Sequence, residues 1–177
     1  FFREQSAAIW QIWQGGLAYH GGLLGGALAL AAYARWRRLS FWRLADALTP
    51  GLALAVGIGW LACFLGGYAY GQMGFGWLYF VWHDLYGVAA SRIAVQPIGA
   101  GLSFVAFIAI WLARPVFRQP GVLFPVFLLL NGIIHFALGF GRGDETLLWI
   151  GWRADQWLAI GQMAAAVGLG LWRGLKT

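Results

Sequence analysis

Charged side chains are scarce in this sequence, where Asp, Glu, Lys and Arg make up 10% of the residues and hydrophobic types 61%. An ordinary soluble domain carries about 25% charged residues. Five stretches contain no charged side chain at all, residues 5–34, 47–82, 93–113, 119–141 and 156–172. A helix needs about 20 apolar residues to cross the hydrocarbon layer of a bilayer. Each stretch offers about that number or more, so the shortage of charge argues against a soluble domain.

Several chemical signals are also missing. Cys63 is the only cysteine, so no internal disulfide can form. The three histidines and six acids show no spacing typical of a zinc site, and no glycine loop of the nucleotide-binding type occurs. We therefore predict no metal and no cofactor, although bound phospholipid is expected. The net charge of +6 does not indicate nucleic-acid binding, because the basic residues lie at the ends of apolar segments, where they anchor helices.

These patterns predict an all-α integral membrane protein with a single transmembrane domain over residues 1–177. About five spans are expected, at residues 19–35, 44–69, 97–113, 121–140 and 156–172. If the spans alternate in direction, eight of the 12 basic residues lie on one face. The positive-inside rule then places the C-terminal tail in the cytoplasm. His20 and Arg142 are accordingly predicted on the outer side of the membrane.

The longest predicted connection, about residues 70–96, is rich in aromatic side chains. They are Phe75, Trp77, Tyr79, Phe80, Trp82 and Tyr86. Aromatic rings favour the headgroup region of a bilayer, where their polar edges stay wet. We expect this segment to lie on the outer leaflet or to dip into it.

One candidate site surrounds His20, within the run Trp-Gln-Gly-Gly-Leu-Ala-Tyr-His-Gly-Gly-Leu-Leu-Gly-Gly at residues 13–26. Six glycines permit unusual backbone geometry and the close approach of a ligand. A neutral His20 beside Tyr19 could act as a base towards a thiol or hydroxyl, with Gly21 and Gly22 lining the lipid. The alternative is a glycine-packed helix entry with a hydrogen-bonded histidine.

A second candidate site combines Arg142 with Arg153, near the outer ends of the last two predicted spans. An arginine fork is suited to holding a lipid phosphate. Asp144 and Asp155 accompany the two arginines, so the alternative is an ion-pair cluster that fixes two helix ends. His135, in the middle of its span, is expected to make a helix–helix hydrogen bond, and with Asp144 it would support the site from behind.

Asp46 lies close to the start of the second predicted span, in the run Leu-Ala-Asp-Ala-Leu-Thr-Pro. We expect its carboxylate to cap that helix or to pair with Arg43.

Residues 13–26 resemble the Trp-x-Gly-Gly-(Leu/Met)-x-(Phe/Tyr)-His-Gly-Gly-Leu segment of bacterial prolipoprotein diacylglyceryl transferases. Residues 35–51, 59–71, 142–145 and 159–163 resemble later elements of that family in the same order. The resemblance implies transfer of a diacylglyceryl group from phosphatidylglycerol to a lipobox cysteine thiol of a preprolipoprotein, at the outer face of the bacterial inner membrane. His20 matches the family histidine, and Arg142 matches an arginine near the outer end of the penultimate helix.

The chain departs from the family at its charged positions, and it is short at the N-terminus. The family signature is Gly-Arg-x-Gly-Asn-Phe-x-Asn-x-Glu. In this sequence Trp60 replaces its arginine, Cys63 and Gly66 replace its asparagines, and Tyr68 replaces its glutamate. His135 and Gly139 occupy positions where the family carries Arg and Glu. Because the leaving group of the reaction bears a phosphate, it needs fixed cations. The missing charges therefore predict impaired phosphate chemistry.

Two hypotheses follow. The first is a lipid-binding, non-catalytic relative, a pseudoenzyme, that serves as a subunit of a larger membrane complex. The 12 tryptophans favour it, since rigid aromatic surfaces suit packing against proteins and lipids. The second is an active transferase whose partners include preprolipoprotein. A transporter or channel is disfavoured, because the spans lack intramembrane acids and inverted halves.

Overall fold

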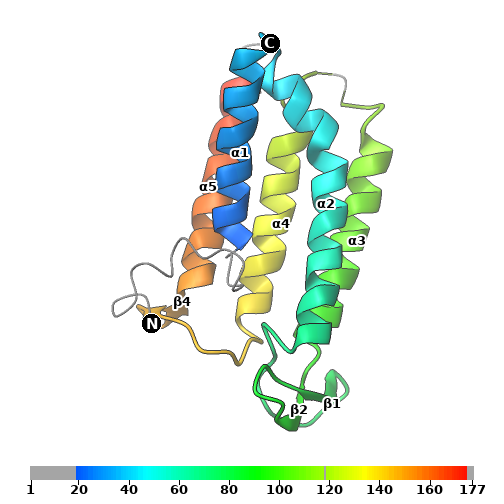
Figure 1. Ribbon diagram of the computed structural model, residues 1–177, viewed down its shortest axis with the longest axis vertical. Helices are drawn as coiled ribbons and strands as arrows, with labels where there is room; N and C mark the ends of the chain where they lie inside the picture. The colour runs from blue at the N-terminus through cyan, green and yellow to red at the C-terminus, as the bar shows by residue number, and fades with distance from the viewer. Residues whose placement is uncertain (1–18, 118, 175–177) are drawn as a thin grey trace. The chain divides into compact units, whose positions relative to one another are not determined.

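The computed structural model describes residues 19–117 and 119–174. The chain divides into two compact units, Phe1–Phe41 and Trp42–Thr177. In its described part the first unit holds helix α1 (Tyr19–Trp36), and the second holds helices α2 to α5 with two small hairpins (Figure 1).

Helix α1 begins at Tyr19 and ends at a turn in which Arg38 has a φ of 55°. The Leu39 N–H donates to the Ala34 carbonyl at 2.8 Å, which closes the last turn of the helix. Gly21 and Gly22 have helical backbone, and no glycine of α1 has a positive φ. The described part of the glycine run therefore forms regular helix, as in the helix-entry alternative.

The remaining helices are α2 (Phe41–Gly66), α3 (Val95–Ala113), α4 (Leu123–Gly139) and α5 (Ala154–Gly174). All five helices agree with the predicted spans to within three residues at each end. The second prediction ran too far, to residue 69, because Gly67 adopts a left-handed φ of 69° and ends α2.

Two helices in the described ranges, α2 and α3, are long and apolar enough to cross a membrane. Helix α4 is apolar but has 17 residues, somewhat short for a perpendicular crossing. That any of the five helices crosses a membrane stays a prediction.

Helices α2 to α5 run alongside one another (Figure 1). Small residues set the spacing between them. A Cβ atom at Gly99 of α3 would lie 2.6 Å from the Trp60 ring of α2, and one at Gly132 of α4 would lie 2.7 Å from Met163 of α5. Trp60 forms a buried cluster with Val95, Ala100 and Leu138.

The α2–α3 connection contains an antiparallel hairpin of β1 (Tyr79–His83) and β2 (Ala89–Ile93), in which Phe80 pairs with Arg92. The all-α prediction is wrong in this detail. Phe75 and Trp77, which precede the hairpin, are 95% and 92% exposed. A second, shorter hairpin of β3 (Leu148–Trp149) and β4 (Trp152–Arg153) precedes α5.

Arg92 and Asp84 form a buried ion pair of 2.7 Å across the first hairpin. The Asp84 carboxylate also accepts the Tyr86 and Val88 N–H groups at 2.9 and 3.0 Å. The Arg92 guanidinium lies 4.5 Å from the centre of the Tyr70 ring. One acid therefore shapes the turn and compensates the buried arginine.

Asp46 caps a helix other than its own. Its carboxylate accepts the N–H groups of Gly121 at 2.6 Å, Val122 at 3.3 Å and Phe124 at 2.9 Å, at the start of α4. These are the N–H groups that a helix start leaves without intrahelical partners. The expected cap of α2 or pair with Arg43 is thus replaced by a bond between α2 and α4.

Candidate functional site

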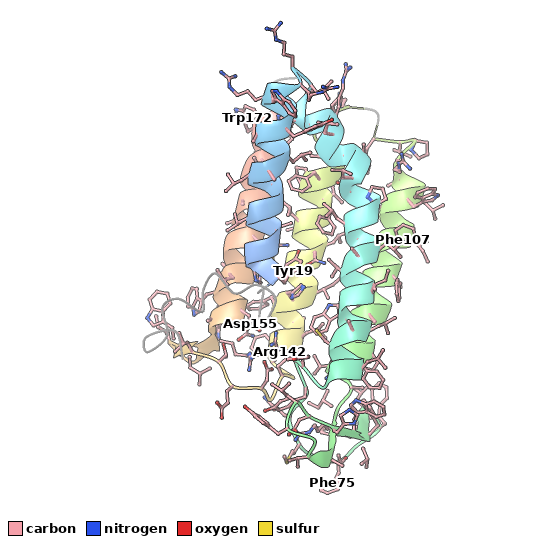
Figure 2. All side chains as sticks on the ribbon, in the orientation of Figure 1. Tyr19, Phe75, Phe107, Arg142, Asp155 and Trp172 are labelled. Carbon is pink, nitrogen blue, oxygen red and sulfur yellow. The ribbon has the colours of Figure 1, made fainter. Side chains whose placement is uncertain are left out.

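Four charged side chains form a closed network where α4 leads to α5. Arg142 donates from Nε to Asp144 at 2.8 Å and from Nη1 to Asp155 at 2.7 Å. Arg153 donates from Nε to Asp155 at 3.1 Å and from Nη2 to Asp144 at 3.2 Å. Each arginine therefore contacts both carboxylates, and the four formal charges cancel. Figure 2 labels Arg142 and Asp155 at this end of the second unit and Trp172 at its opposite end.

The backbone of Arg142 is fixed by the α2–α3 connection. The Gln72 N–H donates to the Gly141 carbonyl at 2.9 Å, and the Gly143 N–H donates to the Tyr70 carbonyl at 2.8 Å. The Gln72 side chain donates to the carbonyls of Phe140 and Arg142 at 3.1 and 3.3 Å. A Cβ atom at Gly143 would lie 2.8 Å from the Gly71 carbonyl oxygen, so this close approach requires glycine.

The backbone of Arg153 is fixed by Gln156 in the first turn of α5. The Gln156 side-chain oxygen accepts the Arg153 N–H at 3.0 Å, and its amide donates to the Phe136 carbonyl of α4 at 3.3 Å. Gly139 makes room for this side chain, since a Cβ atom there would lie 2.5 Å from it. Asp155, also in the first turn, is favourably placed for the helix dipole.

The carboxylates favour the charged form of Arg142. Burial alone would lower the pKa of Arg142, but the hydrogen bond and charge of Asp144 and the charge of Asp155 raise it overall. The side chains of Arg142 and Arg153 are 18% and 10% exposed. Both guanidiniums are therefore largely buried between the same two carboxylates.

A hollow of about 410 Å³ adjoins the network, within the size range of small-molecule sites. Three of the charged residues line it, Arg142, Asp144 and Arg153, together with Gln72, Gln156, Gly139, Phe140, Gly143, Leu148 and Gly151. The structure thus brings together Arg142, Arg153 and Asp144 of the predicted site. It also adds Gln72 and Gln156, which the sequence reasoning missed although both are polar side chains beside apolar segments.

The predicted catalytic pair lies in the other unit. Tyr19 and His20 occupy the first turn of α1, with ring centroids 5.0 Å apart and nearly perpendicular planes. The meeting of His20 with Arg142 and Arg153 stays a prediction. Residues 13–18 of the glycine run lie outside the described residues.

His135 packs on Trp60 in the interior. Their ring centroids lie 5.3 Å apart at an interplanar angle of 35°. Trp60 is 4% exposed, and its indole N–H has no hydrogen-bond acceptor among the described residues. Where the related signature has an arginine, this interior therefore contains an uncharged ring packed on Gly99, His135 and Leu138.

Comparisons with a family model and with individual proteins point to the same family. The family model for prolipoprotein diacylglyceryl transferase matches residues 1–172. A phosphatidylglycerol–prolipoprotein diacylglyceryl transferase of Aromatoleum aromaticum is 30% identical over 96% of this chain and 66% of its own length. Proteins of the same name from Methylibium petroleiphilum and Xanthomonas oryzae pv. oryzae are 28% and 30% identical, over 99% and 92% of this chain. The chain spans 69% and 62% of the length of those two relatives.

Proposed function

Since the chain belongs to the prolipoprotein diacylglyceryl transferase family, we propose that it binds phospholipid in a bacterial inner membrane without transferring the diacylglyceryl group. The relatives named above carry the name of the transferase. This chain matches about two thirds of their length, so its own activity has to be argued from its residues.

The neutral network of Arg142, Arg153, Asp144 and Asp155 is the observation that carries the proposal. Cleavage of a phosphate-bearing lipid leaves negative charge that a fixed cation must stabilise. Here each guanidinium already donates to both carboxylates at 2.5 to 3.2 Å. A phosphate entering the hollow would meet donors whose charge is compensated, so it can be held by hydrogen bonds but gains little stabilisation as negative charge develops.

Trp60 supports the same conclusion from the interior. A buried indole supplies one N–H donor and no charge. Because Trp60 packs on Gly99 and His135, it fills the space between α2, α3 and α4 that a charged signature residue would need.

We further propose that the chain is a subunit of a larger membrane complex. Its outer connections carry large apolar side chains in exposed positions, namely Phe75, Trp77, Leu147, Leu148 and Ile150 at 69–95% exposure. Extended exposed apolar surface marks sites that contact protein or membrane.

An active transferase is the second candidate, and the hollow favours it. Each guanidinium has five N–H groups, of which the network occupies three. The remaining donors are available to a headgroup in a hollow of about 410 Å³.

A transfer assay separates the two candidates. The purified chain is incubated with phosphatidylglycerol and a lipobox peptide, and the peptide is examined by mass spectrometry for the added diacylglyceryl mass. We expect no product above a protein-free control. Thioether formation that is lost in His20→Ala and retained in Arg114→Gln, which changes an arginine at the end of α3, would establish the active transferase instead.

The subunit proposal has a separate test. After purification in a mild detergent, native mass spectrometry should detect a defined stoichiometric complex. The double variant Phe75→Ser/Trp77→Ser should lose the partner, whereas the exposed α3 variant Ile108→Ser should retain it. A monomer under these conditions contradicts the subunit proposal but leaves the lipid-binding proposal intact.

We also propose that all five helices cross the membrane, with Arg142 outside and the tail in the cytoplasm. In a Cys63→Ala background, single cysteines at the exposed Glu145 and at Val116 report opposite faces. A membrane-impermeant maleimide added to spheroplasts should label the first and not the second. Equal labelling would contradict this topology.

A further inference from the structure

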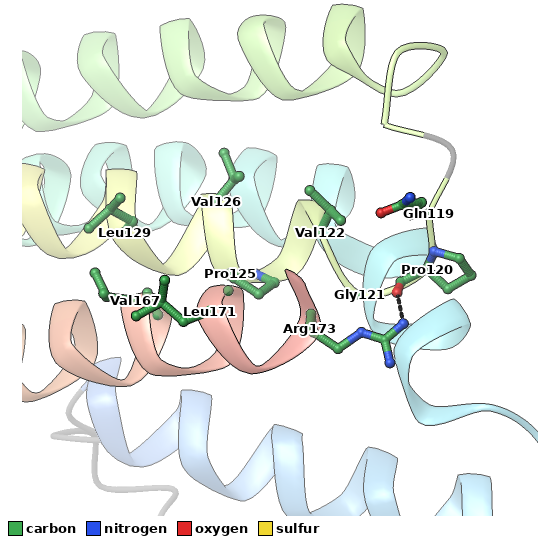
Figure 3. Close-up of a pocket in the computed structure, with 12 residues that line it drawn as sticks. Gln119, Pro120, Gly121, Val122, Pro125, Val126, Leu129, Val167, Leu171 and Arg173 are labelled. Carbon is green, nitrogen blue, oxygen red and sulfur yellow. Dashed lines mark hydrogen bonds between the residues drawn. The ribbon is translucent and has the colours of Figure 1, made fainter. Parts of the chain in front are cut away.

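A second cavity, of about 330 Å³, lies between α4 and α5 at the end of these helices remote from Arg142 (Figure 3). Apolar side chains form most of its wall. They are Val122, Pro125, Val126 and Leu129 of α4 and its entry, and Ala166, Val167 and Leu171 of α5. We call it the α4–α5 groove.

One cation lies at the mouth of the α4–α5 groove. Arg173 donates from Nη2 to the Pro120 carbonyl (Figure 3). Its guanidinium lies 5.5 Å from the centre of the Trp42 ring and 5.9 Å from that of the Trp172 ring. Its Nε is buried and has no hydrogen-bond acceptor among the described residues. Arg173 forms no ion pair within 4.0 Å in the described part of the chain, unlike Arg142 and Arg153.

The Asp46 carboxylate near the groove mouth binds the start of α4. Asp46 accepts three backbone N–H groups at the start of α4, including that of Gly121. A Cβ atom at Gly121 would lie 2.7 Å from the Arg173 Nε, so glycine keeps space beside the guanidinium. Because Arg173 has no carboxylate within 4.0 Å among the described residues, its charge can attract an anion at the groove mouth.

We propose that the α4–α5 groove binds one anionic phospholipid of the membrane leaflet at the Arg173 end, with an acyl chain along the apolar wall and the phosphate against Arg173. The apolar wall would hold an acyl chain, the two indole rings would lie at the level of the membrane interface, and the Arg173 cation would face the phosphate headgroup. Basic pockets between transmembrane helices bind anionic headgroups in this way. The site is separate from the hollow at Arg142 and does not depend on whether the chain transfers a diacylglyceryl group.

Photolabelling of the full chain in lipid nanodiscs tests the proposal. The probe is a phosphatidylglycerol that carries a photoreactive group in one acyl chain, and labelled peptides are identified by mass spectrometry. We expect the label on residues 122–129 and 166–171. Unlabelled phosphatidylglycerol should displace it about fivefold better than phosphatidylcholine with the same acyl chains, the difference expected for one charge near the membrane surface.

Matched variants define the contributions of shape and charge. Val167→Trp should fill the groove and abolish this label, whereas Ile108→Trp on the exposed face of α3 should not change it. Arg173→Gln should remove the preference for phosphatidylglycerol, and Arg173→Lys should keep it, because a point charge at the mouth suffices. Thermal melting of each variant checks that it is folded.

Three results would overturn the proposal. They are a label spread equally over α3 and the α4–α5 groove, equal displacement by the two lipids, and an unchanged label in folded Val167→Trp. None of them bears on thioether formation, so this proposal and the proposed function fail independently.

Discussion

The two ends of the α4–α5 pair use arginine in opposite ways. At one end Arg142 and Arg153 share two carboxylates, and the neighbourhood is neutral. At the other end Arg173 is held by a carbonyl and two indole rings, none of which compensates its charge. The charge of the groups around an arginine, more than the presence of the arginine itself, decides whether it can attract an anion.

The largest loss of stability is expected from a substitution at Trp60, in the interior near the Arg142 end. Trp60→Ala removes an α2 ring packed against α3 and α4 and should lower the free energy of unfolding by about 3–5 kcal/mol. Trp172→Ala, at the other end and 42% exposed, should lower it by about 1 kcal/mol or less. Thermal melting in detergent, followed by circular dichroism, measures both. Equal losses would contradict the buried position of Trp60.

The second-largest loss of stability is expected when the network of Arg142, Arg153, Asp144 and Asp155 is broken. Asp144→Ala leaves two partly buried arginines with one carboxylate and should lower the free energy of unfolding by about 2–3 kcal/mol. It also gives the hollow a net positive charge, so the variant should retain more phosphatidylglycerol than the wild type on native mass spectrometry. Glu145→Ala, an exposed neighbour, is the control and should change neither quantity. A variant with unchanged lipid retention would show that the carboxylates do not suppress anion binding.

Glycines at the two ends should also respond differently. Gly139→Ala forces the methyl group against Gln156 and should destabilise the protein by about 1–3 kcal/mol. Gly170→Ala meets no atom within 4 Å and should be neutral or stabilise α5 by up to about 1 kcal/mol. The difference between their melting temperatures checks the prediction, and a destabilising Gly170→Ala would show that the groove is narrower than described.

The smallest effect is expected for the cap at the Arg173 end. Asp46→Ala removes the acceptor of three N–H groups of α4 and should lower the free energy of unfolding by about 1–2 kcal/mol. Asp46→Asn should lose less, because asparagine also caps helices well. Identical melting of the two variants would indicate that the charge, and not the cap geometry, matters at this position.

The helices could be predicted from the sequence because arginines and prolines lie near the ends of the apolar stretches. The first hairpin was missed because its strand Tyr-Phe-Val-Trp-His was interpreted as interfacial aromatic sequence. A signal for it was present, since the turn residues Asp84 and Gly87 follow a short run rich in β-formers. Gly87 has a φ of 78°, as such a turn requires.

The partners of the charged residues could not be predicted from sequence spacing. The bond from Asp46 to Gly121 joins residues 75 positions apart, and that from Arg142 to Asp155 crosses a loop of 13 positions. Local reasoning favoured Arg43 as the partner of Asp46, because it lies on the same helix. The ion-pair alternative for Arg142 and Arg153 was foreseen, but its closure around both acids depends on the path of the loop.

The contact of residues 70–72 with residues 140–143 has a mechanical consequence. Four hydrogen bonds join the two connections there, whereas the single Asp46 carboxylate supplies three at the opposite end of α4. We expect any rocking of α4 against α2 to pivot about the glycine contact of Gly71 with Gly143. The widest displacement should fall at the Gly121 end, where one side chain supplies all three bonds.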